Sequence, residues 1–162
     1  MGIITLANKY EGGVAVKTLK LFNCKIPSDI GCVCDVVKGV IGFLNETYGL
    51  IDDNTVFDLK VIINELVLNA IKHGNKGDIQ KEVAIMAGVT KDNFLFIIVE
   101  DEGEGYKLNF NYNPRYLEGI TEICDMKETG RGILIVKSLC DKVKLNNRGN
   151  KIVVLKKLTA GR

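Results

Sequence analysis

The chain has 162 residues, and its 22 Lys and Arg nearly balance its 20 Asp and Glu, which leaves a formal net charge of +2. Apolar residues make up 46% and charged residues 26%, a composition typical of a globular domain and not of a disordered chain. This charge gives no strong reason to bind nucleic acid or an anionic membrane. The chain has neither an apolar run long enough to span a bilayer nor an export signal. We therefore expect a single cytoplasmic domain over residues 1–162.

The cysteines are odd in number and scattered along the chain: Cys24, Cys32, Cys34, Cys124 and Cys140. Without an export signal, reduced thiols at apolar positions are the expected state. The spacing of Cys32 and Cys34 could form half of a metal site, but no second cysteine pair accompanies it and the single histidine is distant in sequence. A structural zinc site needs four clustered ligands, so we expect these cysteines to be structural.

The first half of the chain predicts one strand followed by two helices. Partial alternation over residues 14–22 indicates the strand, and apolar residues at three- and four-residue steps over 30–44 indicate an amphipathic helix. A second helix is predicted over residues 56–73. Thr55 is expected to cap its start, and Gly74 to end it in the left-handed conformation.

The second half predicts two hairpins separated by a helix. Residues 83–89 alternate, while residues 94–99 are continuously apolar and are expected to form a strand buried on both faces. A helix is predicted from about 132 to 141, and a closing hairpin over 143–145 and 152–155. Three helices and about five strands predict an α+β two-layer sandwich, with a mixed, mostly antiparallel sheet covered by the helices on one face.

Polar side chains recur along the second predicted helix, in the segment ELVLNAIKHGN. On a regular α-helix Glu65, Asn69 and His73 would form one stacked row beside the apolar stripe. Polar groups at the edge of a buried face are costly unless they serve a purpose or are solvated. Taken alone, this segment favours a half-exposed polar row over a functional site.

The segment DEGEG follows the most apolar strand. Asp101 is expected at the carboxyl end of that strand, where a fixed acceptor could bind a donor such as an exocyclic amine. Gly103 and Gly105 would permit close approach of a flat ligand. An ordinary turn also favours Asp, Glu and Gly, so this segment alone is a weak indication.

The third segment is GRGILIVKSLCDKV, preceded by Thr129. Glycines that lead into a helix present free N–H groups and the positive end of the helix dipole, both of which favour phosphate. Arg131 could add a cation. The segment is neither a Walker A loop nor a Rossmann fingerprint, and a flexible loop before a helix remains the alternative.

The order and spacing of these three segments resemble the N, G1 and G2 boxes of the GHKL (Bergerat-fold) ATP-binding superfamily. The resemblance is closest to the small anti-sigma factor serine/threonine kinases of bacteria, and it covers essentially the whole chain. It implies the Bergerat fold and two cofactors, ATP and Mg²⁺.

The resemblance also implies residue roles at the catalytic end. Glu65 corresponds to the general base, and Asn69 to the amide that ligates Mg²⁺. His73 lies at the end of the N box near the phosphates. Arg131 corresponds to a catalytic cation, since phosphoryl transfer depends mostly on positioning and charge neutralisation.

At the adenine end, Asp101 corresponds to the acceptor for the adenine amine, and residues 106–129 to the ATP lid. The nucleotide-binding residues implied by the resemblance are Asn69, His73, Asp101, Gly103, Gly105, Thr129, Gly130, Arg131, Gly132 and Ile133.

The implied function is a protein kinase that acts as an anti-sigma factor. It would transfer the ATP γ-phosphate to a serine or threonine of a small antagonist protein in a partner-switching pathway. A sigma factor is the second implied partner, and a homodimer the implied assembly; neither nucleic acid nor membrane is expected to bind.

Three alternatives stay open. The chain could be an ATP-gated protein-binding module without catalysis, although Glu65 argues for chemistry. It could be the catalytic domain of a histidine kinase, but its only histidine, His73, lies inside the nucleotide site. A gyrase-like ATPase would need transducer domains and a basic surface.

Overall fold

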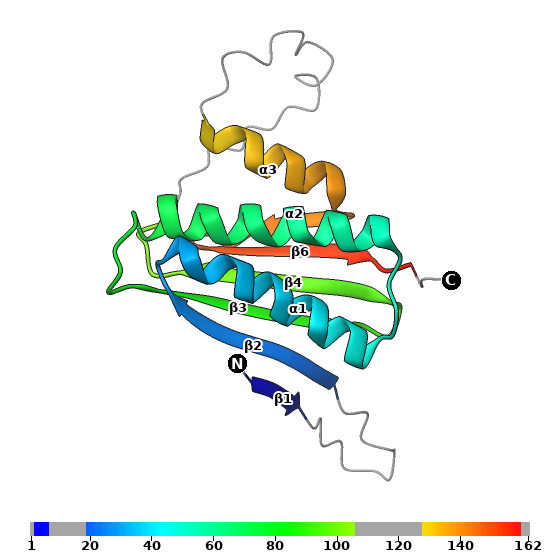
Figure 1. Cartoon of the computed structure of the whole chain (residues 1–162). Helices are drawn as coiled ribbons and strands as arrows, with labels where there is room; N and C mark the ends of the chain where they lie inside the picture. The colour runs from blue at the N-terminus through cyan, green and yellow to red at the C-terminus, as the bar shows by residue number, and fades with distance from the viewer. Residues whose placement is uncertain (1, 7–18, 106–127, 160–162) are drawn as a thin grey trace, which may run out of the picture.

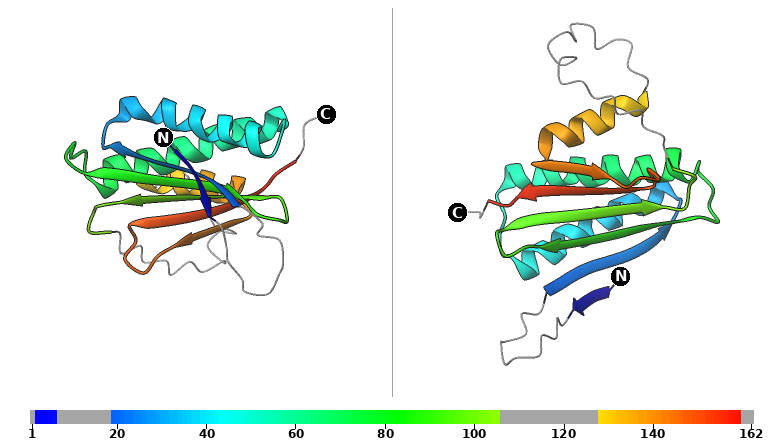
Figure 2. Two further views of the ribbon diagram at one scale, coloured as in Figure 1. Left: turned by 90° about the horizontal axis from the view of Figure 1, so that it is seen from below. Right: turned by 180° about the vertical axis from the view of Figure 1, so that it is seen from behind.

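The computed structural model describes residues 2–6, 19–105 and 128–159. Within them a six-stranded sheet has the order β1-β2-β3-β4-β6-β5, and its neighbouring strands all pair antiparallel. The helices lie on one side of this sheet (Figures 1 and 2). The predicted α+β two-layer sandwich is confirmed. The described sheet contains only antiparallel pairs, so it is not mixed, and it has one strand more than expected.

The strands are β1 (Gly2–Leu6), β2 (Leu19–Pro27), β3 (Glu82–Val89), β4 (Phe94–Asp101), β5 (Lys142–Leu145) and β6 (Lys151–Lys157). The sequence pattern did not predict β1, which pairs with β2 at the edge of the sheet. It predicted a strand over residues 14–22, whereas β2 continues to Pro27; residues 14–18 lie outside the described part of the chain.

The helical elements are η1 (Ile30–Cys32), α1 (Val33–Thr47), α2 (Asp53–Asn69), η2 (Ala70–Gly74) and α3 (Glu128–Leu139). Asp52, not Thr55, caps α2, because the Asp52 carboxylate accepts from the Thr55 amide at 3.0 Å. Gly74 lies inside the π-helical turn η2, and the left-handed conformations follow later, at Lys76 and Gly77. The predicted capping residue and the predicted left-handed conformation of Gly74 were therefore wrong, although the helical run does end at Gly74.

Helix α3 begins four residues earlier than predicted and ends at Leu139. The prediction assumed that the glycines at 130 and 132 would hold the chain out of a helix. In the structure both lie in the first two turns of α3, and Gly132 is buried. A helix tolerates glycine at a modest cost, which close packing against a neighbour can offset.

Strand β4 is buried on one face, contrary to the prediction. Leu95, Ile97 and Val99 are buried, while Phe96 and Ile98 on the opposite face are only half-buried. The reason is that the described helices cover one face of the sheet, so a continuously apolar strand leaves alternate residues partly accessible.

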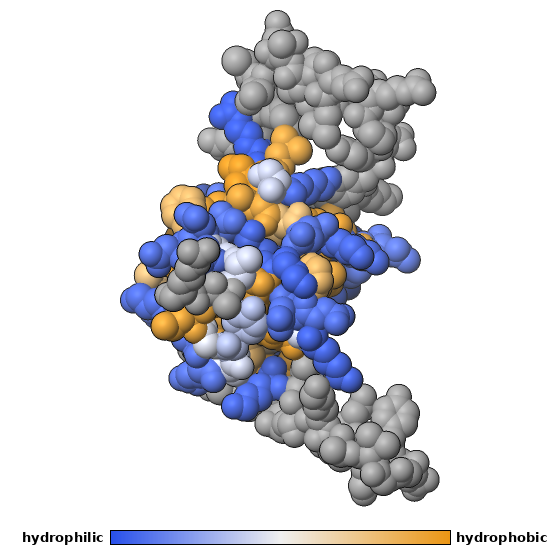
Figure 3. Space-filling model, turned by 90° about the vertical axis from the view of Figure 1, so that its right-hand side faces the viewer, coloured by the Kyte–Doolittle hydropathy of each residue, from blue (hydrophilic) through white to orange (hydrophobic). Residues whose placement is uncertain are grey.

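The core lies between this covered face and the helices. Its largest members with almost no exposed surface are Val36, Val40, Leu44, Leu59, Ile62, Ile63, Leu66, Val67, Ile71, Ile85, Leu95 and Ile97. Side chains from α1 and α2 thus pack on β3 and β4, and Val136 joins them from α3. At the end of the molecule where α2 begins, hydrophilic side chains surround smaller hydrophobic areas (Figure 3). Among the described helices none is long and apolar enough to cross a membrane.

Candidate functional site

The end of the α2–η2 helix packs directly on the end of β4. Gly74 closes η2, and Asp101 is the last residue of β4. A Cβ at Gly74 would overlap the Asp101 carboxyl group, and a Cβ at Gly103 would overlap the Gly74 carbonyl oxygen. Two segments distant in the sequence can therefore meet here only because both residues lack side chains.

Asp101 is held as a fixed acceptor. Its side chain accepts from the Gly103 amide at 2.8 Å, and its own amide donates to the Asn150 carbonyl at 2.9 Å. The residue is only 7% exposed. Burial raises the pKa of Asp101, while the Gly103 amide and the nearby Arg148 guanidinium act in the opposite direction.

Asn75 braces the loop after β4 from the side of η2. It has no exposed surface, and its Nδ2 donates to Ser28 Oγ and to the Glu82 carbonyl, both at 2.9 Å. Its Oδ1 accepts from the Glu102 amide at 2.8 Å. Asn75 therefore fixes the loop that follows Asp101 to the start of β3 and to the residue just after β2.

The turn between β5 and β6 braces the same loop from the other side. Asn150 Nδ2 donates to the Asp101 carbonyl at 2.8 Å, and Arg148 Nη2 donates to the Gly103 carbonyl at 3.1 Å. Gly105 has a φ of +85°, and a Cβ there would overlap the Arg148 carbonyl oxygen. The sequence reading assigned no role to these bracing residues. Among the residues that brace this loop, only Asn75 stands within a segment that the sequence analysis singled out, at the end of the first motif.

The other end of the site lies where α3 meets α2. A Cβ at Gly132 would overlap Glu65 Oε2 and would lie 3.5 Å from Asn69 Nδ2. The structure thus brings together Glu65, Asn69 and Gly132 from two different segments. Arg131, next to Gly132 in α3, is exposed.

The Asn69 side chain is buried at one atom and has the chemistry that the implied Mg²⁺ requires. Within the described residues, its Nδ2 is the buried side-chain atom without a hydrogen-bond partner. A half-turn of the amide exchanges Nδ2 and Oδ1, so Asn69 can present oxygen at the same place. Oxygen is the ligand that Mg²⁺ prefers, and Mg²⁺ usually takes few protein ligands. Asn69 therefore fits the predicted metal ligand.

The predicted row of Glu65, Asn69 and His73 is interrupted. Helix α2 ends at Asn69, and His73 lies in the π-helical turn, which has more residues per turn than an α-helix. His73 is consequently rotated away from the position that α-helical spacing gives. Such turns are frequent at functional sites, and no pattern of residue types signals them.

The remaining candidate residues belong to α3 or to the predicted lid. Thr129 and Gly130 belong to α3, but their side-chain environment is not described, and residues 106–127 of the predicted lid lie outside the described part. Ile133 is half-buried against the core. No three His, Cys, Asp or Glu side chains gather as a metal site in the described ranges, where the cysteines are free thiols.

Residues 34–156 match the histidine kinase-like ATPase domain family, so the chain belongs to that family. An acceptor at the end of β4, an amide and a carboxylate on α2, and glycines in α3 lie within that match.

Two individual relatives and one solved structure are also similar to the chain. The chain is 30% identical over 138 residues to serine-protein kinase RsbW of Bacillus subtilis (strain 168), covering 83% of this chain and 81% of the relative. It is 32% identical over 105 residues to an anti-sigma F factor of Clostridium perfringens (strain SM101 / Type A), covering 62% and 71%. A crystal structure of the RsbU and RsbW domains of Rv1364c from Mycobacterium tuberculosis shares the fold. Its TM-score is 0.60 at 15% identity, covering 87% of this chain and 33% of that chain.

Proposed function

We propose that the protein is an ATP-dependent serine/threonine protein kinase that acts as an anti-sigma factor and phosphorylates a small antagonist protein. The observation that carries this proposal is the meeting of Glu65, Asn69 and Gly132 at the α2–α3 contact. The relatives named as serine-protein kinases and anti-sigma F factors support it, because they resemble the chain over most of their length.

In this proposal the two ends of the site hold the two ends of ATP. Asp101 accepts from the adenine amine, and Gly103 and Gly105 let Gly74 and Arg148 pack closely against the loop that holds Asp101 in place. The first turn of α3 offers its N–H groups and Arg131 to the phosphates, where the helix dipole favours negative charge. Asn69 would hold Mg²⁺, which supplies charge neutralisation on the phosphates when bound.

Glu65 is the proposed general base. Its carboxylate lies beside the phosphate end of the site and would accept the proton of the serine or threonine hydroxyl as that oxygen attacks the γ-phosphorus. The bond to the β–γ bridging oxygen breaks, and ADP leaves with the electron pair. A module that only bound nucleotide would not need a carboxylate at this place.

The experiment is transfer from γ-labelled MgATP to a lysate of the source organism. The proposal expects one small labelled protein whose label is stable to acid and labile to alkali, as for serine or threonine phosphate. An acid-labile label would indicate histidine transfer instead. Absence of label, with an ATP-induced thermal shift that Asp101→Asn removes, would favour the non-catalytic binding module.

Two finer parts of the proposal concern partners and assembly. The name anti-sigma F factor supports binding of a sigma factor, and the name serine-protein kinase supports phosphorylation of a protein, which we propose is the antagonist in the cytoplasm. For a homodimer, the support is the outer face of the sheet, where Phe96, Ile98 and Leu155 are half-buried apolar side chains. Sedimentation of the wild type and of Ile98→Lys tests this: the proposal expects a dimer that the lysine dissociates, and a monomeric wild type would contradict it.

A further inference from the structure

Helices α2 and α3 run antiparallel. Besides their apolar contact, they are joined at two further places, one near each end of α3. At one end Gly132 of α3 lies against Glu65 of α2. At the other end Lys156 joins Leu139, the last residue of α3, to Asp58 of α2. The first contact belongs to the proposed phosphate end of the site, whereas the second lies about two helical turns away from it.

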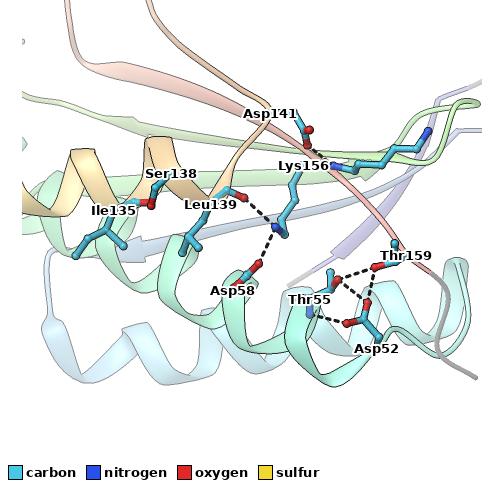
Figure 4. Close-up of polar contacts among 10 residues, drawn as sticks. Asp52, Thr55, Asp58, Ile135, Ser138, Leu139, Asp141, Lys156 and Thr159 are labelled. Carbon is cyan, nitrogen blue, oxygen red and sulfur yellow. Dashed lines mark hydrogen bonds and ion pairs between the residues drawn. The ribbon is translucent and has the colours of Figure 1, made fainter. Parts of the chain in front are cut away.

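Lys156 comes from β6 and reaches between the two helices. Its Nζ donates to Asp58 Oδ2 and to the Leu139 carbonyl, both at 2.8 Å (Figure 4). A carbonyl at the end of a helix has no partner within the helix, and a cation there is favoured by the helix dipole. One ammonium group therefore ties three elements together: β6, the start of α2 and the end of α3.

The contact is shielded from water. The Lys156 side chain is 14% exposed and that of Asp58 28%. Beside them burial raises the pKa of the Cys140 thiol to about 11, so the thiol is neutral near pH 7 and adds no charge to the pair. In such surroundings loss of one partner leaves the other groups poorly compensated.

The spacing of the two contacts matches on both helices. Seven residues separate Asp58 from Glu65 on α2, and seven separate Gly132 from Leu139 on α3. At about 1.5 Å per residue, each pair is about 10 Å apart along its helix. Two contacts at matched spacing fix how far α3 can slide or tilt along α2, with Val136 buried between them.

We propose that Lys156 is a positioning residue for the phosphate-binding end of the nucleotide site. By holding the end of α3 on Asp58, it places Gly132 against Glu65 and Asn69. The inference rests on the proposed function for one point, that MgATP is the ligand of this site.

The test compares ligands that use different ends of the site. Adenosine engages the Asp101 end alone, whereas MgATP also needs the start of α3. In Lys156→Met we expect the Kd for MgATP, measured by calorimetry, to rise on the order of tenfold, the effect of losing about one hydrogen bond to a charged phosphate. The Kd for adenosine, measured by ligand-observed NMR, should stay within about twofold of the wild type.

Lys157→Met is the matched control. It removes the same charge from the next residue, whose Nζ donates to the Asp92 carbonyl at an exposed position away from α3. We expect both ligands to bind this variant as they bind the wild type.

Equal weakening of both ligands, or of neither, would overturn the inference. If Lys156→Met does not fold, Asp58→Asn gives the same test, since it removes the negative charge that faces the Lys156 ammonium and keeps the volume. For Asp58→Asn we expect a smaller loss of MgATP affinity than for Lys156→Met, with the affinity for adenosine unchanged. If the affinities for the two ligands change equally, the inference is overturned. If the wild type binds MgATP no more tightly than adenosine, the proposed function is refuted.

Discussion

At the scale of single residues, the candidate site depends on glycines that face carboxylates. Gly74 lies against Asp101 and Gly132 against Glu65. The sequence indicated Asp101 and the glycines near it, because they follow the most apolar strand. It assigned Gly74 a left-handed conformation instead of a close contact with Asp101, since a pattern along one segment contains no information about a second segment packed against it.

Gly74→Ala tests this close approach. A methyl group would overlap the Asp101 carboxyl group, so we expect the variant to lose about 1–3 kcal/mol of stability. It should also lose the thermal shift given by MgATP. Calorimetric unfolding with and without nucleotide measures both effects.

Gly42→Ala is the control for Gly74→Ala. Gly42 lies in α1, and outside that helix no described atom is within 4 Å of a Cβ built there. This variant should gain about 0.5–1 kcal/mol, because alanine favours a helix, and should keep its nucleotide response. A Gly74→Ala variant that behaved like this control would contradict the packing at Asp101.

Asp101→Asn tests separately what the Asp101 carboxyl group contributes to stability and to nucleotide binding. Burial raises the pKa of Asp101 above 3.8 in the folded protein, so the folded state holds this proton more tightly than the unfolded state. The free energy of unfolding of the wild type should therefore fall, relative to Asp101→Asn, as the pH rises from 3.8 through the folded-state pKa. Asparagine can still accept from the Gly103 amide. Urea unfolding across this range measures the difference.

The same Asp101→Asn variant should show no thermal shift with MgATP, because the acceptor for the adenine amine is altered. Loss of folding at neutral pH without nucleotide would show that the carboxylate is needed for the structure. A retained nucleotide shift would remove Asp101 from the binding site.

At the scale of elements, the start of α2 is fastened to the end of the chain. The Asp52 carboxylate caps α2 and accepts from the hydroxyls of Thr55 and Thr159, beyond β6 (Figure 4). Sequence reasoning placed the start of this helix within a few residues but chose Thr55 as the cap. Both residue types are good caps, and the hydroxyl from Thr159, which favours Asp52, arrives from a distant segment.

This arrangement predicts that the free energy of unfolding depends on pH in the acid range. Hydrogen bonds from Thr159 and Thr55 lower the pKa of Asp52 from 3.8 to about 2. Its stabilising contribution is present above pH 3.8 and is lost as the pH falls through about 2. The stability advantage of the wild type over Asp52→Ala, measured by urea unfolding, should shrink across this window.

Asp53→Ala is the matched control for Asp52→Ala, because it removes a neighbouring carboxylate in the first turn of α2 without removing the cap. If the stability advantage of the wild type over Asp52→Ala stayed constant from pH 3.8 down to about 2, the role of the carboxylate would be contradicted.

At the scale of the whole molecule, hydrophobic periodicity predicted the layers well. The helices that form the core and the two hairpins appear where apolar spacing placed them. The strand β1 was not recognised, because residues 2–6 are too few to give a clear alternation. The π-helical turn was also not recognised, because it depends on how α2 meets β4 and not on residue type.

The account centres on phosphoryl transfer with Glu65 as the base. The most direct measurement compares Glu65→Gln with the wild type in two assays, MgATP affinity and the rate of transfer of the γ-phosphate to the serine or threonine of the antagonist. We expect the affinity to stay within about twofold, and the rate to fall at least about 100-fold, the contribution typical of a general base. A Glu65→Gln variant that transfers phosphate at the rate of the wild type would contradict the account.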